Sequence, residues 1–162
     1  MATLAIGQSA PAFSLSGIDN KKYALNQNDA RLTLAVFFKT TCPTCALAFP
    51  YIEKLHQVYG DAGLAVWGIS QDGRESSADF ASKHGSTFPI LLDADLRVSR
   101  EYHPEFVPTL FLIDASGKIV DRVVAFDKAG LNRVASVAAQ VLGKSASIVA
   151  PDNDGNPAFK PG

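Results

Sequence analysis

Two apolar runs of seven residues each mark the centre of the predicted fold. Residues 32–38 read LTLAVFF, and residues 64–70 read LAVWGIS. Short apolar runs with β-branched and aromatic side chains are typical of strands buried on both faces of a sheet. Between the runs, apolar side chains recur at helical three- and four-residue steps, at Phe49, Ile52, Leu55 and Tyr59. A strand, a helix and a second strand in this order predict a parallel pair.

Shorter elements are predicted on both sides of this unit. They are a hairpin over 13–25, a helix that begins at Ser76 or Ser77 and runs through His84 to Gly85, a strand over 88–92, and a helix over 96–102 capped by Asp93 or Asp95. The hairpin prediction rests on two apolar triplets that flank a turn-rich Gly-Ile-Asp-Asn segment. The helix limits rest on serine and aspartate, which favour N-caps, and on glycine, which adopts the left-handed conformation that ends helices.

The C-terminal part of the predicted fold is a hairpin followed by a helix. Residues 109–113 and 119–125 are apolar strands, and the turn between them is short enough to require an antiparallel pair. Asp127 is expected to cap the last helix, and Gly143 to end it. Together these elements predict an α/β fold in which one mixed sheet lies between helices.

The composition of the chain changes after residue 143. Residues 144–162 contain three prolines, two glycines and few large apolar side chains. A segment of this kind buries too little apolar surface to fix a structure of its own. We therefore expect one domain over residues 1–143 and a tail over residues 144–162 that is mobile or lies on the surface.

Composition and charge exclude several classes of function. With 162 residues, of which 47% are hydrophobic and 19% charged, the chain is expected to form one globular domain with a substantial core. A net charge of -1 and the lack of a long basic run argue against nucleic acid as a partner. No apolar stretch approaches the ~18 residues of a membrane-spanning helix, so membrane insertion is not expected. Residues 1–6 lack the basic region of a signal peptide, which predicts a cytoplasmic protein, or a periplasmic or extracytoplasmic one if an export signal was trimmed.

The only two cysteines lie at the start of the predicted central helix. They form the sequence Cys42-Pro43-Thr44-Cys45, directly after the first apolar strand. Proline is favoured in the first turn of a helix, so Cys42 is expected at the helix N-terminus, where unpaired N–H groups and the helix dipole favour an anion. A thiolate is such an anion, and we predict that Cys42 is a nucleophile. Cys45 lies one turn deeper and is suited to resolve a mixed disulfide on Cys42.

Two other interpretations of the cysteine pair are weaker. A structural zinc site needs four ligands, and the chain has no second cysteine pair and only the scattered His56, His84 and His103. No metal site is therefore predicted. The chain could instead be a binding module in which the disulfide only staples the first helical turn. So short a loop would remove little entropy from the unfolded chain, which makes a purely structural bond a poor staple.

Several segments of the chain occur together in a known protein family. They are the CPTC motif between a strand and a helix, the Phe49-Pro50-Tyr51 sequence that follows it, GQSAPAFSL over residues 7–15, and VPTLFLID over residues 107–114. In this combination the chain resembles the TlpA/ResA-like redoxins over roughly residues 4–142, a group with the thioredoxin fold that is related to the AhpC/TSA peroxiredoxins. The resemblance implies an N-terminal hairpin and an extra helix and strand before a cis-proline at Pro108.

The resemblance also implies an activity and a set of site residues. It implies a thiol–disulfide oxidoreductase that needs no cofactor beyond the Cys42–Cys45 disulfide and acts as a monomer. Its partners would be protein dithiols or disulfides and an upstream thiol reductant. The residues expected to contact the partner chain are Thr41, Pro43, Thr44, Val107 and Pro108.

The chain departs from its relatives at positions that bear on the chemistry. Redoxins carry an acid at one of two positions near the second cysteine, and here these hold Val36 and Ala48, so Glu105 is considered as a substitute base. The alternative function is a thiol peroxidase that uses Cys42. Peroxiredoxins carry a hydroxyl residue three positions before the reactive cysteine, and here that position holds Lys39, which could instead supply positive charge. The sequence therefore favours the oxidoreductase over the peroxidase.

Overall fold

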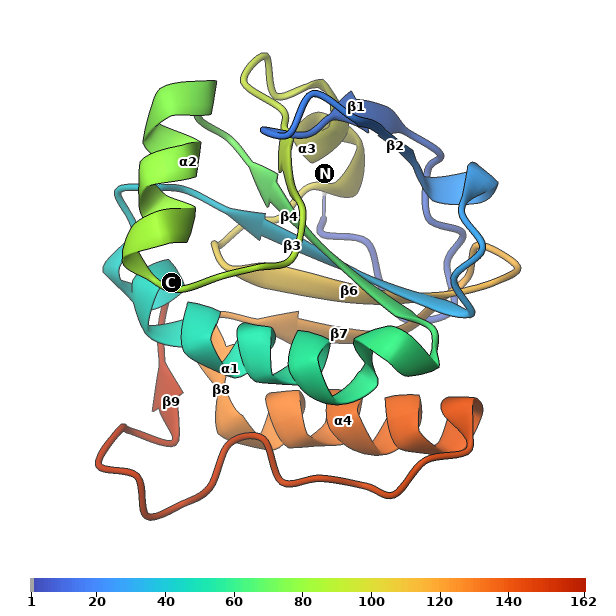
Figure 1. Cartoon of the computed structure of the whole chain (residues 1–162), viewed down its shortest axis with the longest axis vertical. Coiled ribbons are helices and arrows are strands. Elements are labelled where there is room, and N and C mark those ends of the chain that lie inside the picture. Colours follow the sequence, from blue (N-terminus) through green and yellow to red (C-terminus); the bar gives the residue numbers. More distant parts are fainter. Residues whose placement is uncertain (1) are drawn as a thin grey trace.

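The computed structural model describes residues 2–162 and is built around one five-stranded mixed sheet (Figure 1). Its strands are β3 (Leu32–Phe38), β4 (Leu64–Ser70), β5 (Ile90–Leu92), β6 (Thr109–Asp114) and β7 (Ile119–Val124). They lie in the order β5-β4-β3-β6-β7. The first three pair in parallel, whereas β6 runs antiparallel to both β3 and β7. The sheet is the mixed α/β sheet that the sequence predicts, and β3 and β4 have the predicted limits.

Helices cover one face of the sheet more completely than the other (Figure 1). The first face packs against α1 (Pro43–Tyr59), α2 (Arg74–Lys83) and α4 (Lys128–Leu142), and the second against α3 (Arg97–Tyr102) and the hairpin of β1 (Ser14–Ser16) and β2 (Lys22–Ala24). Alternate β3 side chains enter each layer, for example Phe38 in the first and Phe37 in the second. All seven residues of β3 are buried, which explains its unbroken apolar sequence.

The helix limits agree with the sequence except in the middle of the chain. The helix predicted to begin at Ser76 or Ser77 starts earlier, because Gly73 is the N-cap of α2. Both serine hydroxyls donate instead to the Gly73 carbonyl, at 3.3 and 2.6 Å. Gly85 does adopt the predicted left-handed conformation, at φ 68°. The predicted start was wrong because a serine hydroxyl finds a backbone partner both at the N-cap and within the first turn, so serine alone does not fix where a helix begins.

The predictions for the N-terminal ends of α3 and α4 have different outcomes. The N-cap residue of α3 is Leu96, but both predicted residues bond to the first turn: the Asp93 carboxylate accepts the N–H groups of Val98 and Ser99, at 3.1 and 2.8 Å, and the Asp95 carboxylate accepts that of Arg97, at 3.2 Å. Asp127 occupies the N-cap position of α4 but makes no side-chain cap bond. Gly143 ends α4 at φ 69°, as predicted. Within residues 2–162, no helix combines the length and the apolar character needed to cross a membrane.

Residues after α4 turn back along the domain rather than away from it (Figure 1). Two short turns, η1 (Leu25–Gln27) and η2 (Gly60–Ala62), connect the elements described above. The remaining strands, β8 (Phe126–Asp127) and β9 (Phe159–Lys160), pair antiparallel with each other. Since β9 belongs to the C-terminal segment, this pairing brings the end of the described chain next to the start of α1.

Candidate active site

Strand register brings three distant segments to one edge of the sheet. Phe37, near the end of β3, pairs with Thr109 at the start of the antiparallel β6. Phe38 pairs with Ser70 at the end of the parallel β4. This edge is therefore where three segments meet: the residues after β3, the residues after β4 and the residues before β6. It is the edge at which α1 begins with the two cysteines.

Cys42 is the N-cap residue of α1 and is partly exposed. Its Sγ accepts the backbone N–H of Cys45 at 3.1 Å, which is the bond that a capping side chain makes to a free amide of the first turn. The same sulfur lies 3.5 Å from the Val107 carbonyl oxygen, across a sequence separation of 65 residues. Pro43 occupies the first turn of the helix, as predicted. The fold thus directs a helix N–H group at the sulfur of a residue that stays partly exposed.

Cys45 lies behind Cys42 and has no exposed surface. Both cysteines are free thiols in this structure. Burial raises the pKa of the Cys45 thiol, and hydrogen bonding to the neighbouring Cys42 raises it further. A proton is therefore harder to remove from Cys45 than from an ordinary thiol, so this side chain is protonated at neutral pH.

The predicted partner-contacting residues surround the Cys42 sulfur unevenly. Thr41 and Pro43 are exposed beside it, and Val107 is partly exposed on the opposite side. The Val107–Pro108 peptide bond is cis, and Pro108 is buried. Thr44 is buried as well, and its hydroxyl donates to the Pro161 carbonyl at 2.7 Å. The loop and the helix start therefore form two walls of one surface.

Both proposed modulators, Lys39 and Glu105, are exposed. Lys39 contributes its backbone carbonyl, which accepts the Cys42 N–H at 3.3 Å, while its side chain is exposed. Glu105 is exposed and lines a pocket together with Gln71, which follows β4, and with residues of α3 and its flanks, namely Leu96, Ser99, Arg100, His103 and Pro104. Among the described residues, none of the groups that shift the pKa of Cys45 is a carboxylate.

Sequence reasoning missed Asp72 as a residue of this site. Its carboxylate accepts the backbone N–H of Thr40 at 2.7 Å and the Thr40 hydroxyl at 2.9 Å. Thr40 lies two residues before Cys42, so these bonds fix the loop that leads into the helix. The available signal was topological, since residues that follow two adjacent parallel strands leave the sheet at the same edge.

We expect Asp72→Ala to loosen this loop. Without the carboxylate, the partly buried Thr40 loses two hydrogen bonds, which should lower the free energy of unfolding by about 1–3 kcal/mol and slow the reaction of Cys42 with a disulfide. Denaturant unfolding and thiol-exchange rates measure the two effects. Asp79→Ala, at an exposed position of α2, is the matched control. Equal behaviour of the two variants would remove Asp72 from the site.

Across residues 2–162, no three His, Cys, Asp or Glu side chains gather in a way that could hold a metal ion. The groups that the structure brings together around Cys42 are a second thiol, backbone amides and a carbonyl. Such a donor set suits sulfur exchange.

Comparison with known proteins agrees with this geometry. Two curated relatives are the thiol-disulfide oxidoreductase ResA of Geobacillus thermodenitrificans, 30% identical over 72% of this chain and 67% of its own, and the thioredoxin-like protein YneN of Bacillus subtilis, 34% identical over 71% and 69%. Among solved structures, a protein of Chlorobium tepidum assigned as the thiol:disulfide interchange protein DsbE superposes with a TM-score of 0.78. The two share 25% identity over 87% of this chain and 100% of the other. The thioredoxin fold predicted from the sequence is therefore confirmed.

A family model supports the same assignment independently. The model of the AhpC/TSA family matches residues 6–122, which include both cysteines and the Val107–Pro108 segment. That match covers well over half of the chain, and the matches to the two curated relatives cover 67% and 69% of those relatives' lengths. The chain therefore belongs to the AhpC/TSA family.

Proposed function

We propose that this protein is a thiol–disulfide oxidoreductase that exchanges electrons with disulfides in other proteins. The observation that carries the proposal is the arrangement of the two thiols. Cys42 is partly exposed and accepts a helix N–H, whereas Cys45 is buried directly behind it. This asymmetry suits a reaction in which one sulfur meets the partner and the other completes the exchange.

The proposed reaction has two sulfur-exchange steps. The Cys42 thiolate attacks one sulfur of the partner disulfide, so that the partner S–S bond breaks, a mixed disulfide forms, and the other partner sulfur leaves as a thiolate. Cys45 then loses its proton and attacks Cys42 Sγ, which releases the second partner thiolate. The partner gains two electrons and two protons, and the protein is left with a Cys42–Cys45 disulfide. An upstream dithiol reverses that oxidation.

The surface around Cys42 supports an extended polypeptide as the partner. The Val107 carbonyl lies in the loop that leads into β6, beside the sulfur, where the backbone of an extended partner segment can bond to it. The exposed Thr41 and Pro43 would contact the partner from the helix side, and Thr44 offers a hydroxyl. The reaction proposed here requires a single copy of the chain and neither a metal nor an organic cofactor.

The experiment that tests the proposal compares two oxidants. The fully reduced protein is mixed with insulin, as a protein disulfide, and separately with hydrogen peroxide, and the loss of thiols is followed. We expect fast Cys42-dependent exchange with insulin and slow oxidation by peroxide, because the position of the peroxiredoxin hydroxyl holds Lys39. Faster reaction with peroxide than with insulin would refute the proposal and favour the peroxidase, with Lys39 as the first residue to replace.

A further inference from the structure

The segment after α4 returns to the active site. From Gly143 it runs back along α1 and α4, and Figure 1 shows its end beside the first turn of α1. The return follows from the sheet topology. Strand β7 ends at the same edge as Cys42, since Val124 pairs with Thr109, and β8 continues from there. A segment that pairs with β8 is therefore led to this edge.

Two contacts place residues 161–162 between the walls of the partner surface. The Thr44 hydroxyl donates to the Pro161 carbonyl at 2.7 Å. On the other side, Gly162 packs on the Val107 carbonyl so closely that an added Cβ would lie 2.3 Å from the carbonyl oxygen and 3.1 Å from its carbon. The Val107 carbonyl is the group that Cys42 Sγ contacts. Residues 161–162 thus lie against the two residues that flank the nucleophile.

The segment is anchored by backbone pairing and by one buried ammonium group. Phe126 pairs with Lys160 across β8 and β9. The Lys128 side chain, only 3% exposed, donates to the Asp154 carboxylate at 2.6 Å and to the carbonyls of Pro151 and Asn156 at 2.8 and 2.9 Å. Hydrogen bonds from Lys128 and Tyr51 lower the pKa of Asp154 to about 2. The strand pairing and the Lys128–Asp154 ion pair therefore hold the segment at two separate points.

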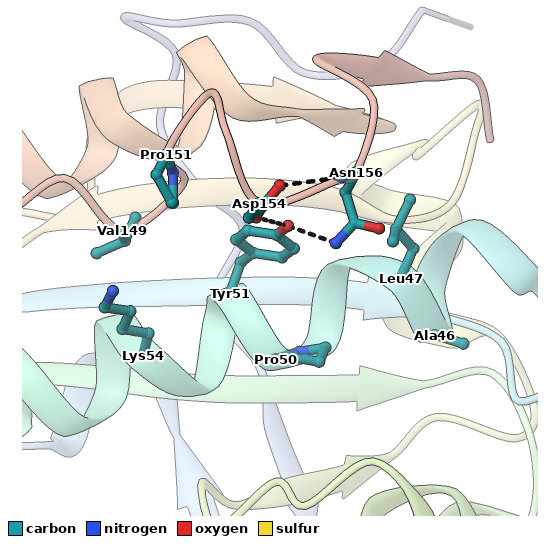
Figure 2. A pocket seen from close by; sticks show the side chains of 9 residues that line it. All are labelled: Ala46, Leu47, Pro50, Tyr51, Lys54, Val149, Pro151, Asp154 and Asn156. Atoms are coloured by element: carbon teal, nitrogen blue, oxygen red, sulfur yellow. Dashed lines mark hydrogen bonds between the residues drawn. The ribbon is translucent and has the colours of Figure 1, made fainter.

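Between these anchors the segment makes few apolar contacts. A pocket of about 430 Å³ lies between α1 and the segment. Figure 2 shows Tyr51 reaching across it to Asp154 and Asn156. Residues 152–159 are exposed, and the Phe159 side chain is 56% exposed. No residue beyond Ala150 belongs to the buried apolar core, so residues 157–162 are held mainly by hydrogen bonds rather than by core packing.

We propose that residues 157–162 occupy the partner-binding surface between Thr44 and Val107 in the resting protein and must be displaced before an extended polypeptide reaches Cys42. This inference rests on the proposed function. The contacts of this segment also indicate which partner fits the surface. It supplies a backbone carbonyl to Thr44 and a residue without Cβ over Val107. An extended partner segment with a small residue at that position makes the same contacts and competes for them.

Two variants test the proposal. In Gly162→Ala the new methyl group meets the Val107 carbonyl, and the shortened chain that ends at Asn156 lacks residues 157–162. Both should reduce insulin about twofold to tenfold faster than the parent protein, the range expected when one hydrogen-bonded contact no longer competes. Their rates with hydroxyethyl disulfide, which is small enough to reach an exposed sulfur, should change less. Asp152→Ala, at an exposed position shortly before residues 157–162, is the matched control.

The outcomes separate this inference from the proposed function. Unchanged insulin rates in both variants, with the reaction still lost in Cys42→Ser, would overturn the inference alone. Insulin reduction that does not depend on Cys42 would overturn the proposed function. Thermal unfolding of each variant shows whether the domain is intact. A peptide with the sequence of residues 156–162 should slow the shortened chain, and a scrambled peptide should not; equal effects of the two peptides would count against a specific surface.

Discussion

Cys42→Ser should abolish the reduction of insulin, whereas Cys45→Ser should react once and remain attached to its partner. Only Cys42 is partly exposed, so its loss removes the attacking sulfur, and rates should fall by about three orders of magnitude or more, as they do when other enzymes lose their nucleophile. In Cys45→Ser the first step is retained, but no thiol is present behind the mixed disulfide to release it. Mass spectrometry after acid quenching measures the covalent adduct directly.

The two serine variants control for each other. Both replace one sulfur by oxygen within the same helical turn, so a general effect on folding would reduce both reactions alike. Adduct in Cys45→Ser and none in Cys42→Ser assigns the roles as proposed. Adduct in both variants would mean that either sulfur can attack, and adduct only in Cys42→Ser would exchange the two roles.

Release of the partner from wild-type protein should accelerate steeply with pH. Burial raises the pKa of the Cys45 thiol, and the sulfur must be a thiolate to attack Cys42. Below its raised pKa, the thiolate fraction grows about tenfold for each pH unit, so release should gain roughly two orders of magnitude between about pH 6.5 and 8.5. The release rate rises with pH because higher pH removes the proton that burial keeps on Cys45. Rapid mixing followed by acid quenching and mass spectrometry gives the decay of the mixed disulfide.

A flat pH profile would contradict this expectation and require a base. Positions 36 and 48, at which the family resemblance implies an acid, hold a buried valine and a buried alanine. Glu105 would then be the first candidate, and Glu105→Gln would have to restore the steep profile. Cys45→Ser is the control, since its adduct should persist at every pH tested.

Local sequence pattern was sufficient for most of the elements. Strands β3 and β4 were predicted with the observed limits because an unbroken apolar run indicates burial on both faces. Cys42 was predicted at a helix N-terminus because Pro43 follows it, and it is the N-cap. Helix α2 was misplaced because two serines and a glycine offered competing starts within four residues, and local hydrogen bonding satisfies either choice.

The sequence by itself determined the sheet, the helix that begins with Cys42, and the burial of Cys45 one turn later, since each depends on residues close together in the chain. Only the tertiary structure decided which groups surround the sulfur. Val107 reaches Cys42 through strand register, Asp72 reaches Thr40 from the next strand, and Pro161 reaches Thr44 after a return of the chain along α1. These contacts join residues that share no local periodicity, so no pattern within a single segment could have revealed them.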